Sequence, residues 1–398
     1  MDFALSAEQQ ALVDSVRRFR EREYDFDKRR AIIGAREGML EGHWQTFAEL
    51  GWLGAGISED AGGYGGGPIE NALILEEFGR SLVVEPFVAH LVAARLLAEI
   101  APQARADLIA AMIAGEERIV LAHYEAAGRG DARHVETIVE PHRDGFRLTG
   151  TKVLVAGGAQ AGRFLVTARD GDGLSLFLVP ADAAGLVRSS YRTLDNHRVA
   201  DLLLDGVTVD AGALVGERRG AMDAVALALD HGVVAICAEA VGVMDEALWI
   251  TRDYLKTRQQ FGMAIGNFQA LQHRMADMLI ETELSRSMLY QALAALGRND
   301  SSARALGVSA AKVQVADAAA FVGAQAIQLH GGIGVTEEYS IGHFYRRLYV
   351  IARTFGGADV HLARYREIAF AGSNDEMAEA GKTLPGSWPE PDKESSKA

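Results

Sequence analysis

Arg258, Phe261 and Gln269 place a guanidinium, an aromatic ring and an amide within one short stretch of the sequence, residues 254–278. The pattern of this stretch is typical of a helix, a sharp break at Phe261 and a second helix that starts near Asn267. Side chains of these three kinds beside a helix N-terminus suit a phosphate group joined to a planar base. The stretch therefore predicts a binding site for a ligand of that kind.

A second segment, Gln328-Leu-His-Gly-Gly-Ile-Gly, adds another amide beside glycines. Gly331 and Gly332 have no side chains, so they let a ligand approach the backbone closely. A helix end closed by a glycine in the left-handed conformation is the alternative interpretation of this segment. For Arg258 and Phe261 the alternatives are a solvated helix end and a core aromatic residue.

The composition is that of a globular protein with two or three domains. The chain has 398 residues, of which 49% are hydrophobic and 24% are charged. Its formal net charge of −14 disfavours non-specific binding to nucleic acid, and no metal site is predicted. The single cysteine, Cys237, lies in an apolar run and is interpreted as a buried structural thiol rather than a nucleophile.

The sequence also bears on where the protein is located. Acidic and polar residues near the N-terminus stand where a signal peptide needs a basic and then an apolar segment. No apolar run approaches the roughly 18–20 residues that a membrane span needs. A cytoplasmic protein without a membrane span is therefore expected.

Hydrophobic periodicity divides the chain into helical and β parts. Short β-like runs fill the middle, separated by turn dipeptides such as Asp144-Gly145 and Asp205-Gly206, which predicts a small antiparallel barrel or sandwich. The last part is expected to hold long helices near 222–257, 267–298, 303–330 and 342–370. The predicted parts are an N-terminal helical domain at 1–118, a middle β domain at 119–221, a C-terminal four-helix bundle at 222–372 and a disordered tail at 373–398.

One glycine-dense stretch, residues 51–67, lies between periodic helical segments. Glycine-rich loops can hold phosphates, but this one lacks the glycine spacing and the Lys-Ser/Thr pair of a phosphate-binding loop. It is interpreted as a tight connection between two helices.

These segments together resemble the acyl-CoA dehydrogenases over residues 1–370 or so. Four segments carry this resemblance, and they follow one another in the order found in the family: GWLGAGISEDAGGYGGG, GFRLTGTKVLVAGGAQAGRFLVTAR, the stretch 254–278 and the stretch 328–347. The resemblance implies an α+β multidomain fold with a helical, a β and a helical domain. The sequence as a whole is most similar to the small subunit of pimeloyl-CoA dehydrogenase-type two-chain enzymes.

The resemblance implies α,β-dehydrogenation of an acyl-CoA thioester with FAD as cofactor. In the family, a carboxylate removes the α-proton while the flavin accepts the β-hydride, and electrons pass to an electron-transfer flavoprotein or similar acceptor. Six residues match positions that grip the adenine-side half of the FAD of a neighbouring subunit: Arg258, Phe261, Gln269, Gln328, Gly331 and Gly332.

The positions that the family uses for the catalytic base do not match. Counted from Gly331, the commonest base position is occupied by Phe355, which cannot take a proton. The second known base position is occupied by Gly232, followed by Val233 where the family has arginine. Neither position carries a carboxylate.

The side of the site that holds the chain's own flavin ring also departs from the family. Tyr124-Glu125 occupies the position where the family usually has Thr-Glu. The stretch that begins at Val153 occupies the position of the family's Trp-Ile-Thr-Asn. Gly357 stands for a threonine that touches the flavin. The half-site for a neighbour's FAD is thus kept, and the half-site for the chain's own flavin is altered.

Three functions are compatible with this pattern. The first is a non-base subunit of a heteromeric acyl-CoA dehydrogenase, with α2β2 composition, that completes the FAD site of a catalytic subunit. The second is a self-sufficient homotetramer with a relocated base, for which Asp230 is the best candidate and His231 its orienting neighbour; a buried or interface histidine is the alternative for His231. The third is a relative that binds acyl-CoA or a partner without turnover.

Overall fold

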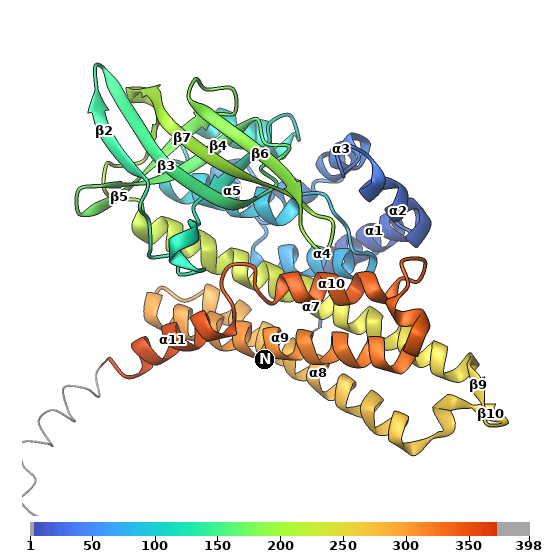
Figure 1. Ribbon diagram of the computed structural model, residues 1–398. Coiled ribbons are helices and arrows are strands. Elements are labelled where there is room, and N and C mark those ends of the chain that lie inside the picture. Colours follow the sequence, from blue (N-terminus) through green and yellow to red (C-terminus); the bar gives the residue numbers. More distant parts are fainter. Residues whose placement is uncertain (1–3, 372–398) are drawn as a thin grey trace, which may run out of the picture.

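A β region separates two helical regions in the computed structural model, which describes residues 4–371 (Figure 1). Figure 1 shows the strands at the top, the C-terminal helices below them and the first helices at the right. One hydrophobic core joins the N-terminal helices to the C-terminal helices, and a second core fills the β region. The predicted fold class is confirmed, whereas the tail predicted to be disordered, 373–398, lies outside the described residues.

The N-terminal region is built from short amphipathic helices. A capping box starts the first of them, because Ser6 Oγ accepts the Gln9 N–H and Gln9 Oε1 accepts the Ser6 N–H, each over 3.1 Å. The helices of this region are α1 (Ala7–Glu23), α2 (Phe26–Gly34), α3 (Glu41–Glu49), α4 (Pro68–Ser81), α5 (Phe87–Ile100) and α6 (Ala106–Ile113).

The glycine-dense stretch 51–67 connects α3 to α4, as the sequence predicted. Two of its glycines are needed because the chain folds back on itself. A Cβ at Gly63 would lie 2.2 Å from the carbonyl oxygen of Ile57, and one at Gly66 would lie 2.1 Å from that of Ala55. The glycines therefore serve tight backbone packing.

The β region is an eight-stranded sheet with the order β6-β7-β3-β2-β4-β5-β8, and β1 pairs with β4 beside this path. Its strands are β1 (Ile119–Ala122), β2 (Ile138–His142), β3 (Gly145–Ala156), β4 (Arg163–Asp170), β5 (Gly173–Pro180), β6 (Leu186–Arg192), β7 (Arg198–Asp210) and β8 (Leu214–Val215).

Two details of the sheet differ from the antiparallel arrangement that the sequence predicted. Strand β1 pairs with β4 in parallel, and β2 also meets β4 in parallel at Ile138. The dipeptide Asp205-Gly206 was predicted to be a turn but lies inside β7, where Gly206 has a φ of 65°. Local turn chemistry was overruled there by the long pairing of β7 with β3 and β6.

The C-terminal region consists of long helices that pack on one another. They are α7 (Met222–Thr257), α8 (Gln269–Leu296), α9 (Ser301–His330), α10 (Ile341–Ile351) and α11 (Ala358–Ala369), with a short hairpin of β9 (Gln259–Gln260) and β10 (Met263–Ala264) after α7. The helix predicted at 342–370 is two helices instead. The chain turns between them at Phe355 and Gly356, which both have positive φ values, 58° and 96°.

Two of these helices are long and apolar enough to cross a membrane by length and composition. They are α7 and Ser301–Val335. Their most apolar 18-residue segments have mean hydropathies of 1.8 and 1.3. The prediction that no such run exists was therefore wrong. In the fold 83% and 56% of these segments are buried, and core helices pass the same test.

Buried charges tie the three regions together. Arg347 of α10 donates from Nε and Nη2 to both carboxylate oxygens of Glu239 in α7, each over 2.6 Å. Its Nη1 donates to Asp195 of the β6–β7 turn over 2.7 Å. Arg29 of α2 donates to the carbonyl oxygen of the same Asp195 over 3.3 Å. Because isolated buried charges are costly, this group fixes how the regions meet.

Candidate functional site

The six residues predicted to bind a cofactor lie at one end of the C-terminal helices (Figure 1). One segment follows α7 and opens α8, and the other forms the last turn of α9 and the 3₁₀ turn after it. We call this set the cofactor face; its residues are Arg258, Phe261, Gln269, Gln328, Gly331 and Gly332.

Two side-chain contacts bring the two segments of the cofactor face together. Tyr254 of α7 stacks on His330 of α9, with ring centroids 4.5 Å apart. Arg274 in α8 donates from Nη1 to Oε1 of Gln325 in α9 over 3.0 Å. The start of α8 therefore lies beside the end of α9, as the predicted site requires.

The cofactor face is open to solvent. The Phe261 side chain is 88% exposed and its φ is 55°, in the left-handed region that few non-glycine residues adopt. A Cβ added at Gly331 or Gly332 would meet no heavy atom within 4 Å. Arg258, Gln269 and Gln328 are exposed as well. The face thus has room for a ligand held together with another chain.

The cofactor face fits the phosphate-and-base half of FAD. Helix α8 begins without a side-chain cap, so its first N–H groups are available to an anion. Arg258 lies beside this helix start, because its carbonyl oxygen accepts the N–H of Ile265 over 2.8 Å. A guanidinium there can bind a pyrophosphate in charge-assisted hydrogen bonds, and the Phe261 ring can stack on a base.

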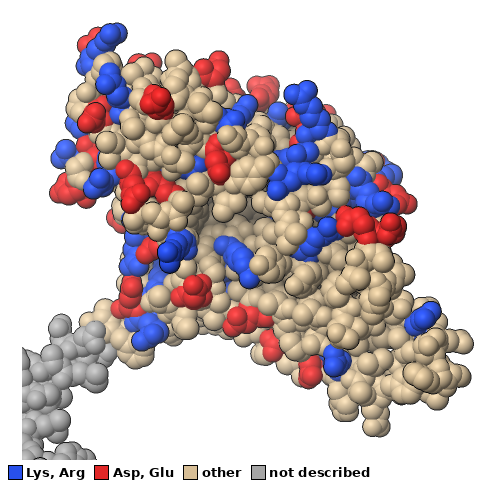
Figure 2. Space-filling view, viewed as in Figure 1, with Lys and Arg blue, Asp and Glu red and all other residues tan. Residues whose placement is uncertain are grey.

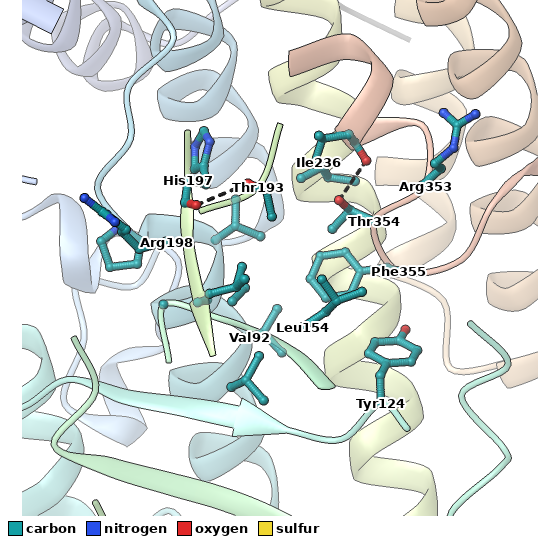
Figure 3. Close-up of a pocket in the computed structure, with 18 of the residues that line it drawn as sticks. Val92, Tyr124, Leu154, Thr193, His197, Arg198, Ile236, Arg353, Thr354 and Phe355 are labelled. Carbon is teal, nitrogen blue, oxygen red and sulfur yellow. Dashed lines mark hydrogen bonds between the residues drawn. The ribbon is translucent and has the colours of Figure 1, made fainter. Parts of the chain in front are cut away.

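A cavity of about 750 Å³ lies between the sheet and helices α7 and α10 (Figure 3). Figure 2 shows the molecular surface hollowed between the strands and the C-terminal helices, with basic side chains near the hollow. Arg129 and Arg353 line the cavity. Figure 3 shows the apolar side chains of Val92, Leu154 and Phe355 inside it. Its size and apolar lining are those of a small-molecule site.

The two positions that the resemblance assigns to a catalytic base lie against each other at the wall of this cavity, which Phe355 lines. A Cβ added at Gly232 would lie 3.1 Å from Cζ of Phe355 and 2.8 Å from a methyl group of Val92. The Phe355 ring therefore occupies the space into which a side chain at 232 would project. The His361 Nε2–H donates to the Phe355 carbonyl oxygen over 2.9 Å and holds this turn. Neither position can accept a proton.

The wall that would face a flavin ring is apolar and internally bonded. The Val153 N–H donates to the carbonyl oxygen of Tyr124, and the Leu154 N–H donates to Asp201, each over 2.9 Å. The Leu154 side chain is 59% exposed, with a φ of 52°. Two backbone donors of this wall are thus used within the chain, and Gly357 adds no hydroxyl.

Asp230, the candidate for a relocated base, is held by two arginines. Its Oδ1 accepts from Arg364 over 2.7 Å, and its Oδ2 accepts from Arg304 over 3.0 Å. The carboxylate is 1% exposed and is not among the residues that line the cavity. An ion-paired carboxylate in this position favours a structural role.

We therefore expect Asp230→Asn to leave turnover of the assembled enzyme within a few-fold of the parent. Loss of a positioned base costs about 10²–10⁴ in rate, so steady-state kinetics separate the two roles clearly. The variant should instead lower the melting temperature, since it takes the charge from two arginine contacts. A rate loss of two decades in an intact, flavin-loaded complex would place the base on this chain.

His231 does not orient Asp230. Neighbouring residues in a helix do not face each other. His231 is buried, and this burial, with Arg95 nearby, lowers its pKa to about 3, so the ring is neutral at pH 7. These surroundings favour the alternative interpretation of His231, a buried histidine. Cys237 is buried too, and burial raises the pKa of its thiol to about 11.

Sequence reasoning missed a buried ion pair under the flavin-facing wall. Lys152 is 0% exposed and its Nζ lies 2.7 Å from Oε1 of Glu125, which also accepts the Thr137 N–H and Oγ1–H. Burial lowers the pKa of Lys152 to about 8, although Glu125 opposes this. The sequence signal for this pair was a lysine at an inward-facing position of a strand whose side chains alternate between the two faces of the sheet.

Comparison with known proteins identifies the family. The acyl-CoA dehydrogenase N-terminal domain matches residues 6–116, and the acyl-CoA dehydrogenase C-terminal domain matches residues 219–368. The probable acyl-CoA dehydrogenase YngJ of Bacillus subtilis is 30% identical, over 87% of this chain and 93% of its own. Acyl-CoA dehydrogenase FadE27 of Mycobacterium tuberculosis is 29% identical, over 82% of this chain and 87% of its own.

Solved structures agree with this family. A variant of the Tcur3481-Tcur3483 steroid ACAD matches with a TM-score of 0.85 at 33% identity, over 92% of this chain and 99% of its own. A chain of the ChsE4-ChsE5 complex from Mycobacterium tuberculosis matches with a TM-score of 0.85 at 27% identity, over 93% and 99%. From its sequence and its fold, this chain belongs to the acyl-CoA dehydrogenase family of FAD-dependent oxidoreductases.

Proposed function

We propose that this chain is the subunit without a base in a two-chain acyl-CoA dehydrogenase, where it completes the FAD site of a catalytic subunit. One observation carries the proposal: all six residues of the cofactor face are exposed, whereas Phe355 packs against Gly232 where a base would stand. A self-sufficient enzyme needs both halves of the site, and this chain presents one.

The chemistry is divided between the two chains in this proposal. FAD accepts the hydride in the α,β-dehydrogenation of an acyl-CoA thioester. The catalytic subunit supplies the carboxylate that removes the α-proton. This chain binds: Arg258 brings positive charge to the pyrophosphate, the Phe261 ring covers the base, and Gly331 and Gly332 let the cofactor approach the backbone.

The named neighbours support a two-chain assembly. Both the ChsE4-ChsE5 complex and the Tcur3481-Tcur3483 protein are named for two components. We infer an α2β2 complex for this chain, acting on an acyl-CoA whose acyl group is a dicarboxylic acid, a long-chain fatty acid or a steroid side chain. We also infer a cytoplasmic location and electron transfer to an electron-transfer flavoprotein or similar acceptor.

Flavin content tests the proposal directly. Expressed alone, the chain should be colourless or poorly soluble. The partner supplies half of each FAD site, and it also covers the apolar residues that are exposed on the C-terminal helices of this chain. A tagged chain purified from its own host should instead bring a second acyl-CoA dehydrogenase-like subunit and FAD. Absorbance at the flavin bands and the mass of each chain give the stoichiometry.

The same experiment can overturn the proposal. A monodisperse homotetramer of this chain with stoichiometric FAD would establish the self-sufficient enzyme instead. As a matched control, replacing the carboxylate base of the catalytic subunit by glutamine should abolish activity while this chain is unchanged.

A further inference from the structure

The loop after the cofactor-face glycines is anchored by a buried histidine. His343 of α10 is 2% exposed, and its Nε2 lies 3.3 Å from the carbonyl oxygen of Glu337 and 3.4 Å from Oε1 of the same residue. Gly331 and Gly332 open the 3₁₀ turn, Gly331–Val335, that leads to Glu337. The position of this loop is therefore tied to α10 through one imidazole ring.

The other nitrogen of this ring faces a buried arginine. Arg29 of α2 is 1% exposed and donates from Nη1 to Nδ1 of His343 over 3.0 Å. A guanidinium can only donate, so Nδ1 is the bare nitrogen and Nε2 carries the hydrogen. The Nε2–H then donates to Glu337. Burial, with Arg29 and Arg346 nearby, lowers the pKa of His343 to about 4, so the ring is neutral at pH 7.

Arg29 is itself fixed by two further contacts. Its Nε donates to the carbonyl oxygen of Leu82 at the end of α4 over 2.8 Å, and its Nη2 donates to that of Asp195 over 3.3 Å. The ring of Phe26 packs edge-on against His343, with centroids 5.0 Å apart. A rigid part of the fold thus reaches the loop through His343.

A second contact reaches the loop from the solvent side. Arg346 donates to Oε1 of Glu337 over 3.1 Å, in a pair whose carboxylate is 58% exposed. Exposed pairs of this kind contribute little to stability. The contact from His343, whose ring is buried, is therefore the stronger restraint on the backbone of Glu337.

We propose that His343 is a positioning residue for FAD bound in trans: it holds the loop at Glu337 so that Gly331 and Gly332 present their backbone to the cofactor. This inference rests on the proposed function, because it needs the cofactor face to contact a partner's FAD. His343 acts through the loop and does not touch the cofactor itself.

Two conservative substitutions separate this role from a structural one. An asparagine amide reaches the place of Nδ1, so His343→Asn keeps the Arg29 contact and loses the Glu337 contact. A glutamine amide reaches the place of Nε2, so His343→Gln keeps the Glu337 contact. We expect the FAD dissociation constant of the two-chain complex to rise about 3- to 10-fold for His343→Asn, the effect of one hydrogen bond. For His343→Gln it should stay within about twofold of the parent.

A purely structural role predicts the opposite order. If His343 serves only to pair with buried Arg29, His343→Gln should be the more damaging variant and His343→Asn the milder one, both in melting temperature and in FAD binding. That order, an unchanged FAD affinity in His343→Asn, or a His343→Asn chain that fails to assemble overturns the positioning role. Size-exclusion chromatography and thermal melting of each flavin-free complex supply the assembly and stability readouts.

Arg258→Ala, measured in parallel, distinguishes the two levels of inference. If Arg258→Ala leaves FAD binding unchanged, the cofactor face does not bind FAD and the proposed function fails. If Arg258→Ala weakens binding while His343→Asn does not, the proposed function stands and only the positioning role fails. Arg346→Ala, which removes the exposed contact to Glu337, is the control and should leave FAD affinity within about twofold.

Discussion

Replacing Arg258 by alanine is expected to weaken FAD retention in the two-chain complex by about one to two decades. A hydrogen bond to a charged group contributes roughly 1.5–3 kcal/mol, and 1.4 kcal/mol corresponds to one decade in affinity. Arg258 is exposed and caps the end of α7, so its removal should leave the fold of the chain intact. Equilibrium dialysis against flavin-free buffer, with the remaining FAD measured by absorbance, gives the change.

Two matched variants sharpen this test. Arg258→Lys keeps the charge but loses the planar fork that binds a pyrophosphate through two hydrogen bonds, so its affinity should fall between parent and Arg258→Ala. Arg298→Ala removes another exposed arginine, beyond the opposite end of α8, and should change nothing. Unchanged flavin occupancy in Arg258→Ala would remove the cofactor assignment of this face.

Replacing Arg347 by methionine is expected to destabilise the chain by about 3–5 kcal/mol, the cost of breaking a buried ion pair from one side. The variant takes the guanidinium from two buried carboxylates, since Glu239 is 3% exposed and Asp195 is 1% exposed, and leaves Asp195 its contact with His197. The same change loosens the contact between α10, α7 and the β6–β7 turn. Thermal or urea unfolding of the purified complex measures the loss.

The pH dependence of that loss has a definite sign. Burial alone would raise the pKa of Asp195, but His197 and Arg347 hold it well below its ordinary value of 3.8. A carboxylate with a lowered pKa contributes stability above its ordinary pKa and loses it as the pH falls through the folded-state value. The deficit of Arg347→Met should therefore be full near pH 7 and shrink below about pH 4.

An exposed ion pair provides the control for Arg347. Arg22 lies 2.6 Å from Glu23, but its side chain is 76% exposed. Arg22→Met makes the same chemical change at the surface and should cost less than about 1 kcal/mol. Equal effects of the two substitutions would contradict the role assigned to the buried group around Arg347.

The long helices were the most predictable part of the fold. Apolar periodicity over many turns predicted helices near 222–257, 267–298 and 303–330, and α7, α8 and α9 lie within a few residues of those bounds. Periodicity is local, so it survives without knowledge of neighbours. The single helix predicted at 342–370 is broken at Phe355, which takes a left-handed conformation. The hydrogen bond from His361, six residues further along the chain, stabilises this turn.

The pairing of the strands and the burial of charged side chains could not be predicted from the sequence. The parallel contact of β1 with β4 joins segments far apart in the chain, and no turn dipeptide records it. Lys152 was not recognised as buried, because its partner Glu125 lies in another segment. Whether a charge is buried with a partner depends on which segments meet, and spacing along the chain does not contain that information.

The sequence by itself determined the chemical groups of the site. Phe355 and Gly232 cannot act as bases, and Arg258 with Phe261 can bind a phosphate and a base; these follow from residue type alone. Only the tertiary structure decided how the groups are used. It packs the Phe355 ring against Gly232, and it encloses Asp230 between arginines of two other helices. The physical reason is that proton transfer and ion pairing act over a few ångströms in space, a distance set by packing between segments.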